Sequence, residues 1–231
     1  MNIKIIDTET ASLKGTILEV GTVTVDNNLK FISEETDLIR PPDGTVLSYE
    51  AMAVNNITPE MLEGKPTFTE VQDEYNGADV YVAHNKSFDQ KVLTKEDHTF
   101  GDKQWVCTLQ LARKIYPDSP SHKLMVLFYY LGIYKTFNYE GEAHRALFDV
   151  HVTYALLQHM MQTQKVNTLE DLLESTKVDV AKEKCTFGKH RGKTWEWILE
   201  NDLSYCRWVV ANALKKGNEQ VVREWLTEKI N

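Results

Sequence analysis

The sequence has few of the residues that crosslink small proteins. Only three of its 231 residues are cysteines, Cys107, Cys185 and Cys206, and no two of them have Cys-x-x-Cys spacing. An odd and scattered set of this kind excludes a disulfide framework and a cysteine zinc site. Because free thiols persist in reducing compartments, we expect a cytoplasmic protein that is stabilised by a hydrophobic core.

Long apolar segments are also missing. The longest nearly apolar stretch, Leu124–Tyr134, is too short to cross a bilayer and contains Gly132. Lys4 and Asp7 interrupt the first apolar run, so we expect no secretory signal and no contact with a membrane. The hydrophobic fraction of 42% and the charged fraction of 26% are ordinary for a globular protein.

The chain lacks the positive net charge that is common among nucleic-acid-binding proteins. Its formal net charge is −8. Residues 177–231 contain eleven Lys or Arg and eight Asp or Glu, so the excess of acidic residues lies within residues 1–176. This distribution disfavours a broad electrostatic contact with a duplex. It is compatible with a short contact at a strand end and with acidic side chains that bind metal ions.

Hydrophobic periodicity predicts an α/β fold with a mixed five-stranded sheet flanked by helices. Three strands come first, at Ile3–Asp7, Ile17–Val25 and Phe31–Ile39. Helical segments then alternate with two short strands. The remaining predicted elements are strands at Asp79–Ala83 and Trp105–Cys107, helices at Ser48–Ala53, Phe68–Tyr75, Ser87–Leu93, Leu109–Tyr116, Ser121–Leu131 and Arg145–Gln164, and a short helix opened by Thr58-Pro59-Glu60.

A polar segment, Lys177–Lys184, predicts a boundary between two units because it has no hydrophobic period. The residues from 177 to 231 include four of the five tryptophans, Trp195, Trp197, Trp208 and Trp225. Such a short segment cannot bury a large core. We therefore expect a main domain at residues 1–176 and a small helical C-terminal unit with an aromatic core at residues 177–231.

The segment IIDTET places two acids beside a strongly apolar run. Asp7 and Glu9 are two residues apart, so on a strand both side chains leave the same face. Buried carboxylates are costly without partners, which favours a binding role. The alternative is that the strand ends at Ile6 and that the acids lie in a solvated turn.

Two further blocks carry the same chemistry. In HNKSFD, Asp89 follows the fourth predicted strand, where open α/β sheets gather their sites; alternatively it only complements a helix dipole. In HRALFD, His144 precedes Asp149 by five residues, and Asp149 falls inside a helix that should pack on the sheet. The alternative for His144 is an ordinary histidine in a surface loop.

Taken together, the blocks predict a metal-dependent nuclease. Four converging carboxylates repel one another strongly unless divalent cations lie between them. Two such ions about 3.5–4 Å apart are the usual means of hydrolysing a phosphodiester. A histidine adds a base that can be neutral at physiological pH.

In this order the blocks resemble those of the DEDD exonucleases, in the subclass with histidine at HxxxxD spacing. The resemblance covers residue 1 to about 165 through DTET, HNKSFD and HRALFD, and TFGKHRGKTW extends it into the C-terminal unit. It implies a ribonuclease H-like sheet, two Mg²⁺ ions or Mn²⁺ in their place, and 3′→5′ release of nucleoside monophosphates. DNA 3′ ends are the expected partner. RNA 3′ ends and a proofreading subunit bound to a polymerase stay open as alternatives, as does the oligomeric state.

The resemblance also implies a role for each catalytic residue. Asp7, Glu9 and Asp149 would hold the ion that activates water. Asp7 would bridge to a second ion, and Asp89 would complete the shell of that ion. His144 would take the proton from the attacking water.

Residues expected to contact the substrate lie in and near the same blocks. Phe88 is predicted to stack on a terminal base, although a phenylalanine beside a sheet is more often part of the core. The basic segment TFGKHRGKTWEW suits contact with a phosphate backbone, or else forms only a solvated hairpin. The full set of predicted contacts is Thr8, Thr10, Leu13, Asn85, Phe88, Lys189, Arg191 and Lys193.

Overall fold

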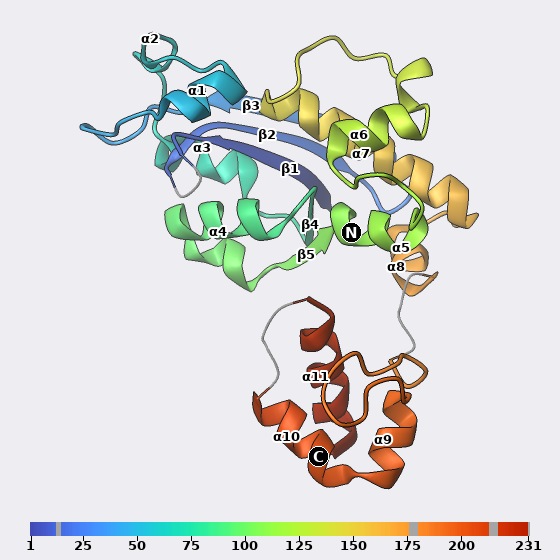
Figure 1. Ribbon diagram of the computed structural model, residues 1–231. Coiled ribbons are helices and arrows are strands. Elements are labelled where there is room, and N and C mark those ends of the chain that lie inside the picture. Colours follow the sequence, from blue (N-terminus) through green and yellow to red (C-terminus); the bar gives the residue numbers. More distant parts are fainter. Residues whose placement is uncertain (13–14, 176–179, 213–216, 231) are drawn as a thin grey trace. The chain divides into compact units, whose positions relative to one another are not determined.

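The computed structural model describes residues 1–12, 15–175, 180–212 and 217–230. The chain divides into two compact units, Met1–Thr176 and Lys177–Asn231 (Figure 1). Within the described residues, no helix has both the length and the apolar character needed to span a membrane.

The first unit is built on a five-stranded mixed sheet, as predicted. Its strands are β1 (Ile3–Thr10), β2 (Ile17–Val25), β3 (Phe31–Leu38), β4 (Val80–Ala83) and β5 (Gln104–Cys107), in the order β3-β2-β1-β4-β5. β2 is antiparallel to β1 and β3, whereas β4 is parallel to β1 and to β5. The carboxyl ends of β1, β4 and β5 therefore meet at one edge of the sheet.

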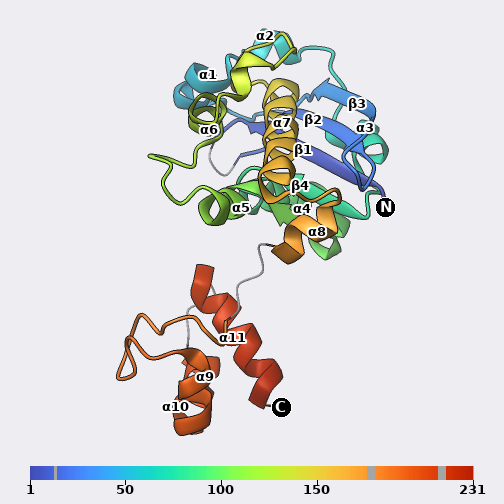
Figure 2. The same cartoon turned by 90° about the vertical axis from the view of Figure 1, so that its right-hand side faces the viewer.

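Helices cover both faces of this sheet. The long helix α7 (Ala146–Gln164) packs across one face, over β1 and β2 (Figure 2). The other helices of this unit are α1 (Tyr49–Asn55), α2 (Pro59–Leu62), α3 (Phe68–Tyr75), α4 (Ser87–Glu96), α5 (Thr108–Ile115), α6 (Leu124–Tyr130) and α8 (Leu169–Ser175), with short 3₁₀ turns at His98–Asp102 and Ile133–Lys135.

Alternate side chains of β1 point to opposite faces of the sheet and help to form a hydrophobic core on each face. Ile3 and Ile5 belong to the apolar cluster that includes Val150 and Leu156 of α7, whereas Ile6 belongs to the cluster with Phe68 of α3. Successive strand side chains point to opposite faces, which explains the division. Because both faces are covered, any charged side chain on β1 must be placed at its end or receive partners.

Three predicted boundaries were wrong by three residues each. Helix α4 runs to Glu96 and not to Leu93. β1 continues to Thr10 because the pairing with β2 runs on to Thr10 opposite Ile17, so the two acids lie on a strand and not in a turn. α6 begins at Leu124, three residues later than predicted. There the Ser121 hydroxyl accepts a hydrogen bond from the Lys123 N–H, a local turn that competes with helix formation.

In its described residues, the C-terminal unit combines a hairpin with three helices, α9 (Trp195–Asn201), α10 (Leu203–Asn212) and α11 (Gly217–Ile230). The hairpin closes through a bridge between Lys184 and Thr194. A separate apolar cluster contains Trp195 and Ile198 from α9, Cys206 and Val209 from α10, and Leu226 from α11. This aromatic and aliphatic core matches the helical appendage expected from the sequence.

A buried ion pair fixes the start of α7 on β2. Glu19 is 3% exposed, and its carboxylate accepts hydrogen bonds from the Arg145 guanidinium at 2.6 and 3.0 Å and from the Ala146 N–H at 3.1 Å. Gly21 allows this close approach, since a Cβ there would lie 2.7 Å from the Leu147 nitrogen. The pair therefore sets where the first turn of α7 begins.

We predict that Glu19→Ala lowers the free energy of unfolding by about 2–3 kcal/mol, measured by urea denaturation. Loss of one partner from a fully buried pair costs about 3–5 kcal/mol, and the cost is smaller here because the Arg145 side chain is 36% exposed. Glu34→Ala, which removes a 39%-exposed carboxylate paired with His151, should cost less than about 1 kcal/mol. Equal losses in the two variants would contradict the role assigned to Glu19.

Candidate metal and catalytic site

Asp7 and Glu9 lie at the carboxyl end of β1, at the edge where the parallel strands meet. Helix α1 secures this end of the strand. The Asn55 amide donates to the Thr10 carbonyl at 3.4 Å and also hydrogen-bonds the Glu9 carboxylate. The strand end is therefore fixed by a side chain that the sequence did not single out.

Asp89 lies in the first turn of α4 and is 2% exposed. Its Oδ1 accepts hydrogen bonds from the Thr8 N–H at 3.0 Å and from the Thr8 hydroxyl at 2.9 Å. Thr8 lies between the two acids of β1, so these bonds hold Asp89 against the same strand end. A carboxylate that only complemented a helix dipole would need no such partners.

His144 and Asp149 come from the turn before α7 and from its first turn. His144 has φ +66°, and its backbone N–H donates to Asp149 Oδ2 at 3.2 Å while its side chain is exposed. The other oxygen, Asp149 Oδ1, is buried without a hydrogen-bond partner. A buried oxygen of this kind is costly unless it binds a ligand.

These groups converge. Glu9, His144 and Asp149 each offer a ligand atom, and the three atoms lie within 4.8 Å of one another. The carboxyl of Asp7 is adjacent, since the charges of Asp89, Asp149 and Glu9 all act on it. The structure thus brings together all five residues that were predicted from three separate blocks.

The electrostatics of the cluster fit divalent cations. Burial, and then the neighbouring carboxylates, raise the pKa of Asp7 well above its ordinary range and the pKa of Glu9 to about 8. Burial likewise raises the pKa of Asp89 to about 7 and that of Asp149 to about 6. Carboxylates that resist ionisation next to one another become stable as anions when cations neutralise them. Together with the unpartnered Asp149 oxygen, this donor set fits metal binding.

The residues predicted to contact substrate near the cluster have mixed surroundings. The Thr8 and Thr10 side chains are buried, and their hydroxyls donate to Asp89 and to the Ser12 carbonyl. Asn85 is exposed in a turn with φ +78°. Phe88 is half-buried and packs against the apolar cluster of α3 and α4, which favours the core alternative. Leu13 lies outside the described residues, and all of these substrate roles stay predictions.

His84 is a further positioning residue at this edge. Its Nδ1 lies 2.9 Å from the Thr108 hydroxyl, and its Nε2 donates to the His122 carbonyl at 2.8 Å. Burial lowers its pKa to about 4, so the ring is neutral near pH 7. His84 therefore ties the end of β4 to the segment before α6. Its place inside HNKSFD was the only signal in the sequence.

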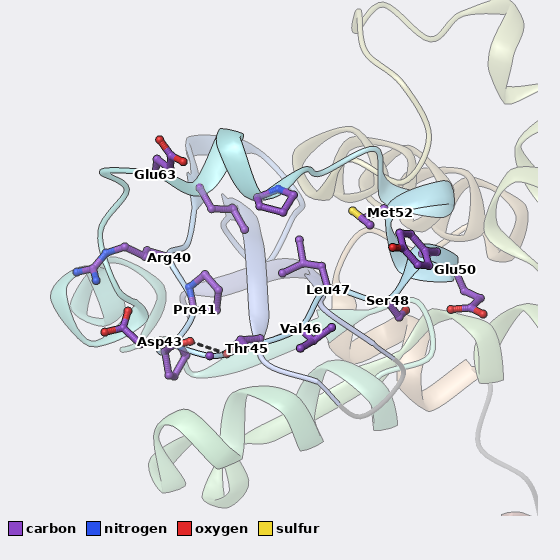
Figure 3. Close-up of a pocket in the computed structure, with 15 residues that line it drawn as sticks. Arg40, Pro41, Asp43, Thr45, Val46, Leu47, Ser48, Glu50, Met52 and Glu63 are labelled. Carbon is purple, nitrogen blue, oxygen red and sulfur yellow. Dashed lines mark hydrogen bonds between the residues drawn. The ribbon is translucent and has the colours of Figure 1, made fainter.

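A groove of about 790 Å³ lies outside this cluster, between the segment Arg40–Ser48 and helices α1 and α2 (Figure 3). Val46, Leu47 and Met52 contribute apolar side chains to it, and Arg40, Asp43 and Glu63 lie at its rim (Figure 3). None of the clustered carboxylates lines the groove. The carboxylate cluster thus lies at the sheet edge and not in this cavity.

Comparison with known proteins agrees with the site. The family model described as "Exonuclease" matches residues 5–157. Exodeoxyribonuclease 10 of Escherichia coli (strain K12) is 35% identical over 216 residues, which are 91% of this chain and 91% of that protein, so the match extends into the C-terminal unit. The PolC-type DNA polymerase III of Listeria welshimeri is 32% identical over 172 residues, 70% of this chain but 11% of that protein.

A solved structure, exonuclease X in complex with 5′ overhanging duplex DNA, is similar with a TM-score of 0.61 and 34% identity over 76% of this chain and 99% of that one. The first unit therefore has the ribonuclease H-like fold that the resemblance implied, and the chain is a nuclease by homology as well as by its residues. On these grounds, the chain belongs to the exonuclease family.

Proposed function

We propose that this protein is a 3′→5′ exodeoxyribonuclease that releases nucleoside 5′-monophosphates in a reaction dependent on two divalent cations. The observation that carries the proposal is the buried Asp149 Oδ1, which has no hydrogen-bond partner and belongs to a carboxylate cluster beside an exposed histidine. A cluster built in this way suits cations better than protons. Carboxylate ligands are those that Mg²⁺ prefers, and Mn²⁺ accepts the same set.

Each side chain of the cluster has its own role in the proposed reaction, according to its position. When bound, the ions would activate a water and neutralise charge on the scissile phosphate. Glu9 and Asp149 would hold one ion, Asp7 would contact both, and Asp89, held by Thr8, would face the second. The exposed His144 imidazole would accept the proton of the attacking water, because it lies beside Glu9 and Asp149 without being enclosed by protein.

DNA is the proposed substrate because the relatives that match nearly their whole length are named for it. The E. coli exodeoxyribonuclease has 91% of its length aligned, and the exonuclease X structure contains DNA. The polymerase relatives have about a tenth of their length aligned, so a free-standing enzyme is favoured over a polymerase-bound subunit. RNA 3′ ends stay an alternative that the same test resolves.

The test is hydrolysis of 5′-labelled and 3′-labelled single-stranded DNA, duplex DNA and RNA with Mg²⁺. We expect 5′-labelled DNA to shorten one nucleotide at a time and 3′-labelled DNA to release labelled mononucleotide at once. Asp7→Asn, which keeps the shape but removes the bridging charge, should lose more than a hundredfold in turnover while remaining folded. Turnover within tenfold of wild type, a loss of about 1.4 kcal/mol, is too little for a bridging ligand and would contradict the two-metal assignment.

We predict that His144→Ala lowers the single-turnover rate constant for cleavage by about 10²–10⁴-fold. The affinity for a DNA end should stay nearly unchanged. A positioned base contributes to the chemical step and not to binding. Activity should recover partly at alkaline pH, where hydroxide replaces the missing base, whereas the Asp7→Asn defect should not. Full turnover at pH 7 with weakened DNA binding would show that His144 is a binding residue.

We also predict that the metal-free protein loses stability as the pH rises from about 4 to 8. Unfolded Asp and Glu have pKa values near 4, whereas those of Asp149, Asp89 and Glu9 are raised to about 6, 7 and 8 in the fold. The native state therefore binds more protons in this window, and deprotonation destabilises it. Unfolding free energies from urea titrations in EDTA should show this fall.

The same urea titrations with Mg²⁺ in place of EDTA provide the comparison for this pH dependence. Mg²⁺ should raise the free energy of unfolding most at pH 8 and least at pH 5, because protons and cations compete for the same oxygens. Asp7→Asn should flatten the fall in EDTA, since one repelling charge is gone. A metal-free stability that rises between pH 5 and 8 would contradict the burial of these carboxylates together.

A further inference from the structure

Two indole rings on the C-terminal unit are exposed although their neighbours form its core. Trp197 is 38% exposed and Trp208 is 51% exposed, whereas Trp195, two residues before Trp197, is 2% exposed. Large aromatic side chains at the surface of a small unit cost solvation energy and mark sites of interaction when they occur together. Neither ring takes part in the carboxylate cluster of the first unit.

The two indoles are the ends of one row of aromatic rings. His190 meets Trp197 edge-on with centroids 5.7 Å apart and Tyr205 with centroids 4.9 Å apart, and Tyr205 stacks on Trp208 at 5.7 Å. The middle of the row is enclosed, since Tyr205 is 7% exposed and the His190 side chain is 17% exposed. The exposed ends thus rest on a rigid, buried middle.

Hydrogen bonds lock this middle to the hairpin. His190 Nε2 lies 2.8 Å from Asp202 Oδ2, and the Tyr205 hydroxyl donates to the Phe187 carbonyl at 3.3 Å. Gly188 has φ +65°, and a Cβ there would lie 2.2 Å from the Tyr205 hydroxyl. That glycine is therefore needed for close packing inside the unit.

Three basic side chains lie near this row of rings, and they differ in whether an acidic group neutralises them. Lys189 Nζ lies 2.6 Å from Asp202 Oδ2, and hydrogen bonds from Lys189, Ser204 and His190 hold the pKa of Asp202 well below its usual range. The charge of Lys189 is therefore largely matched. Lys193 Nζ lies 4.7 Å above the Trp197 ring, and Arg191 is exposed in the same hairpin. Within the described part of the chain, neither of these two has an acidic partner.

We propose that this face, formed by Trp197, Trp208, Arg191 and Lys193, binds single-stranded nucleic acid at a site separate from the bond that is cleaved. Exposed indole rings beside unmatched cations suit a ligand that presents both flat rings and negative charges, and single-stranded nucleic acid does so with its bases and phosphates. The excess of basic residues in 177–231 has the matching sign. The proposal rests on the proposed function, and it gives the C-terminal unit the task of retaining the strand while its end is processed.

The test compares the full-length protein with Trp208→Ala and Trp208→Phe in binding to a fluorescent dT20 oligonucleotide. Anisotropy is measured in EDTA, so that no metal-dependent cleavage interferes. Loss of one base-stacking ring should raise Kd about fivefold or more in Trp208→Ala, whereas Trp208→Phe keeps a flat ring and should stay within about twofold. Circular dichroism checks that the half-exposed position tolerates both changes.

Salt dependence separates stacking from charge. Arg191→Ala should flatten the slope of log Kd against log salt by about 0.7, because one phosphate contact is lost, whereas Trp208→Ala should leave the slope unchanged. Lys229→Ala, which removes an exposed cation on α11, is the matched charge control and should alter neither Kd nor slope. These two effects test the ring and the cation independently.

Cleavage of a tetranucleotide separates this proposal from the proposed function. Trp208→Ala should hydrolyse it at the wild-type rate and lose efficiency only on long strands. If wild type cleaves nothing with Mg²⁺ or Mn²⁺, the proposed function is wrong, while the comparison in EDTA still reports on binding. Wild-type Kd and salt slope for dT20 in both Trp208→Ala and Arg191→Ala would overturn the inference. So would a Trp208→Ala change from dimer to monomer in gel filtration with unaltered DNA binding, since the face would then join two copies.

Discussion

Mutual repulsion among four carboxylates is the constraint on which the rest of the first unit depends. Asp7, Glu9, Asp89 and Asp149 come from β1, α4 and α7. Burial raises the pKa of each, and neighbouring carboxylates raise the pKa of Asp7, Glu9 and Asp149 further. A fold selected only for stability would separate these groups. Holding them together costs folding free energy, and that cost is expected where a site must be ready for cations before they arrive.

Neighbouring groups donate hydrogen bonds to the carboxylates and so offset part of this repulsion. Thr8 donates twice to Asp89, Asn55 donates to Glu9, and the backbone of His144 donates to Asp149. Each bond restricts a carboxylate to one orientation, and the Glu19–Arg145 pair fixes the helix that carries the last of them. One oxygen, Asp149 Oδ1, is left without a partner, which is consistent with a place kept for a metal ion.

The sequence predicted the parts of this arrangement that follow from local pattern. Period-two spacing placed Asp7 and Glu9 together, and the strand and helix order predicted the mixed sheet. It could not predict how far β1 extends, because that depends on pairing with β2, nor the role of Glu19, whose partner Arg145 is 126 residues away. In the C-terminal unit, a run of similar basic residues gave no sign that Asp202 neutralises Lys189 and leaves Arg191 free of acidic partners within the described residues.

The backbone at His144 shows how local strain and chemistry are linked. A non-glycine residue at φ +66° is uncommon and costs of order 1 kcal/mol or more. In return, the same turn directs the His144 N–H to Asp149 Oδ2 and keeps the imidazole exposed beside Glu9 and Asp149. The left-handed backbone of His144 therefore serves both contacts at once, and the pair between Glu19 and Arg145 anchors the residue that follows it.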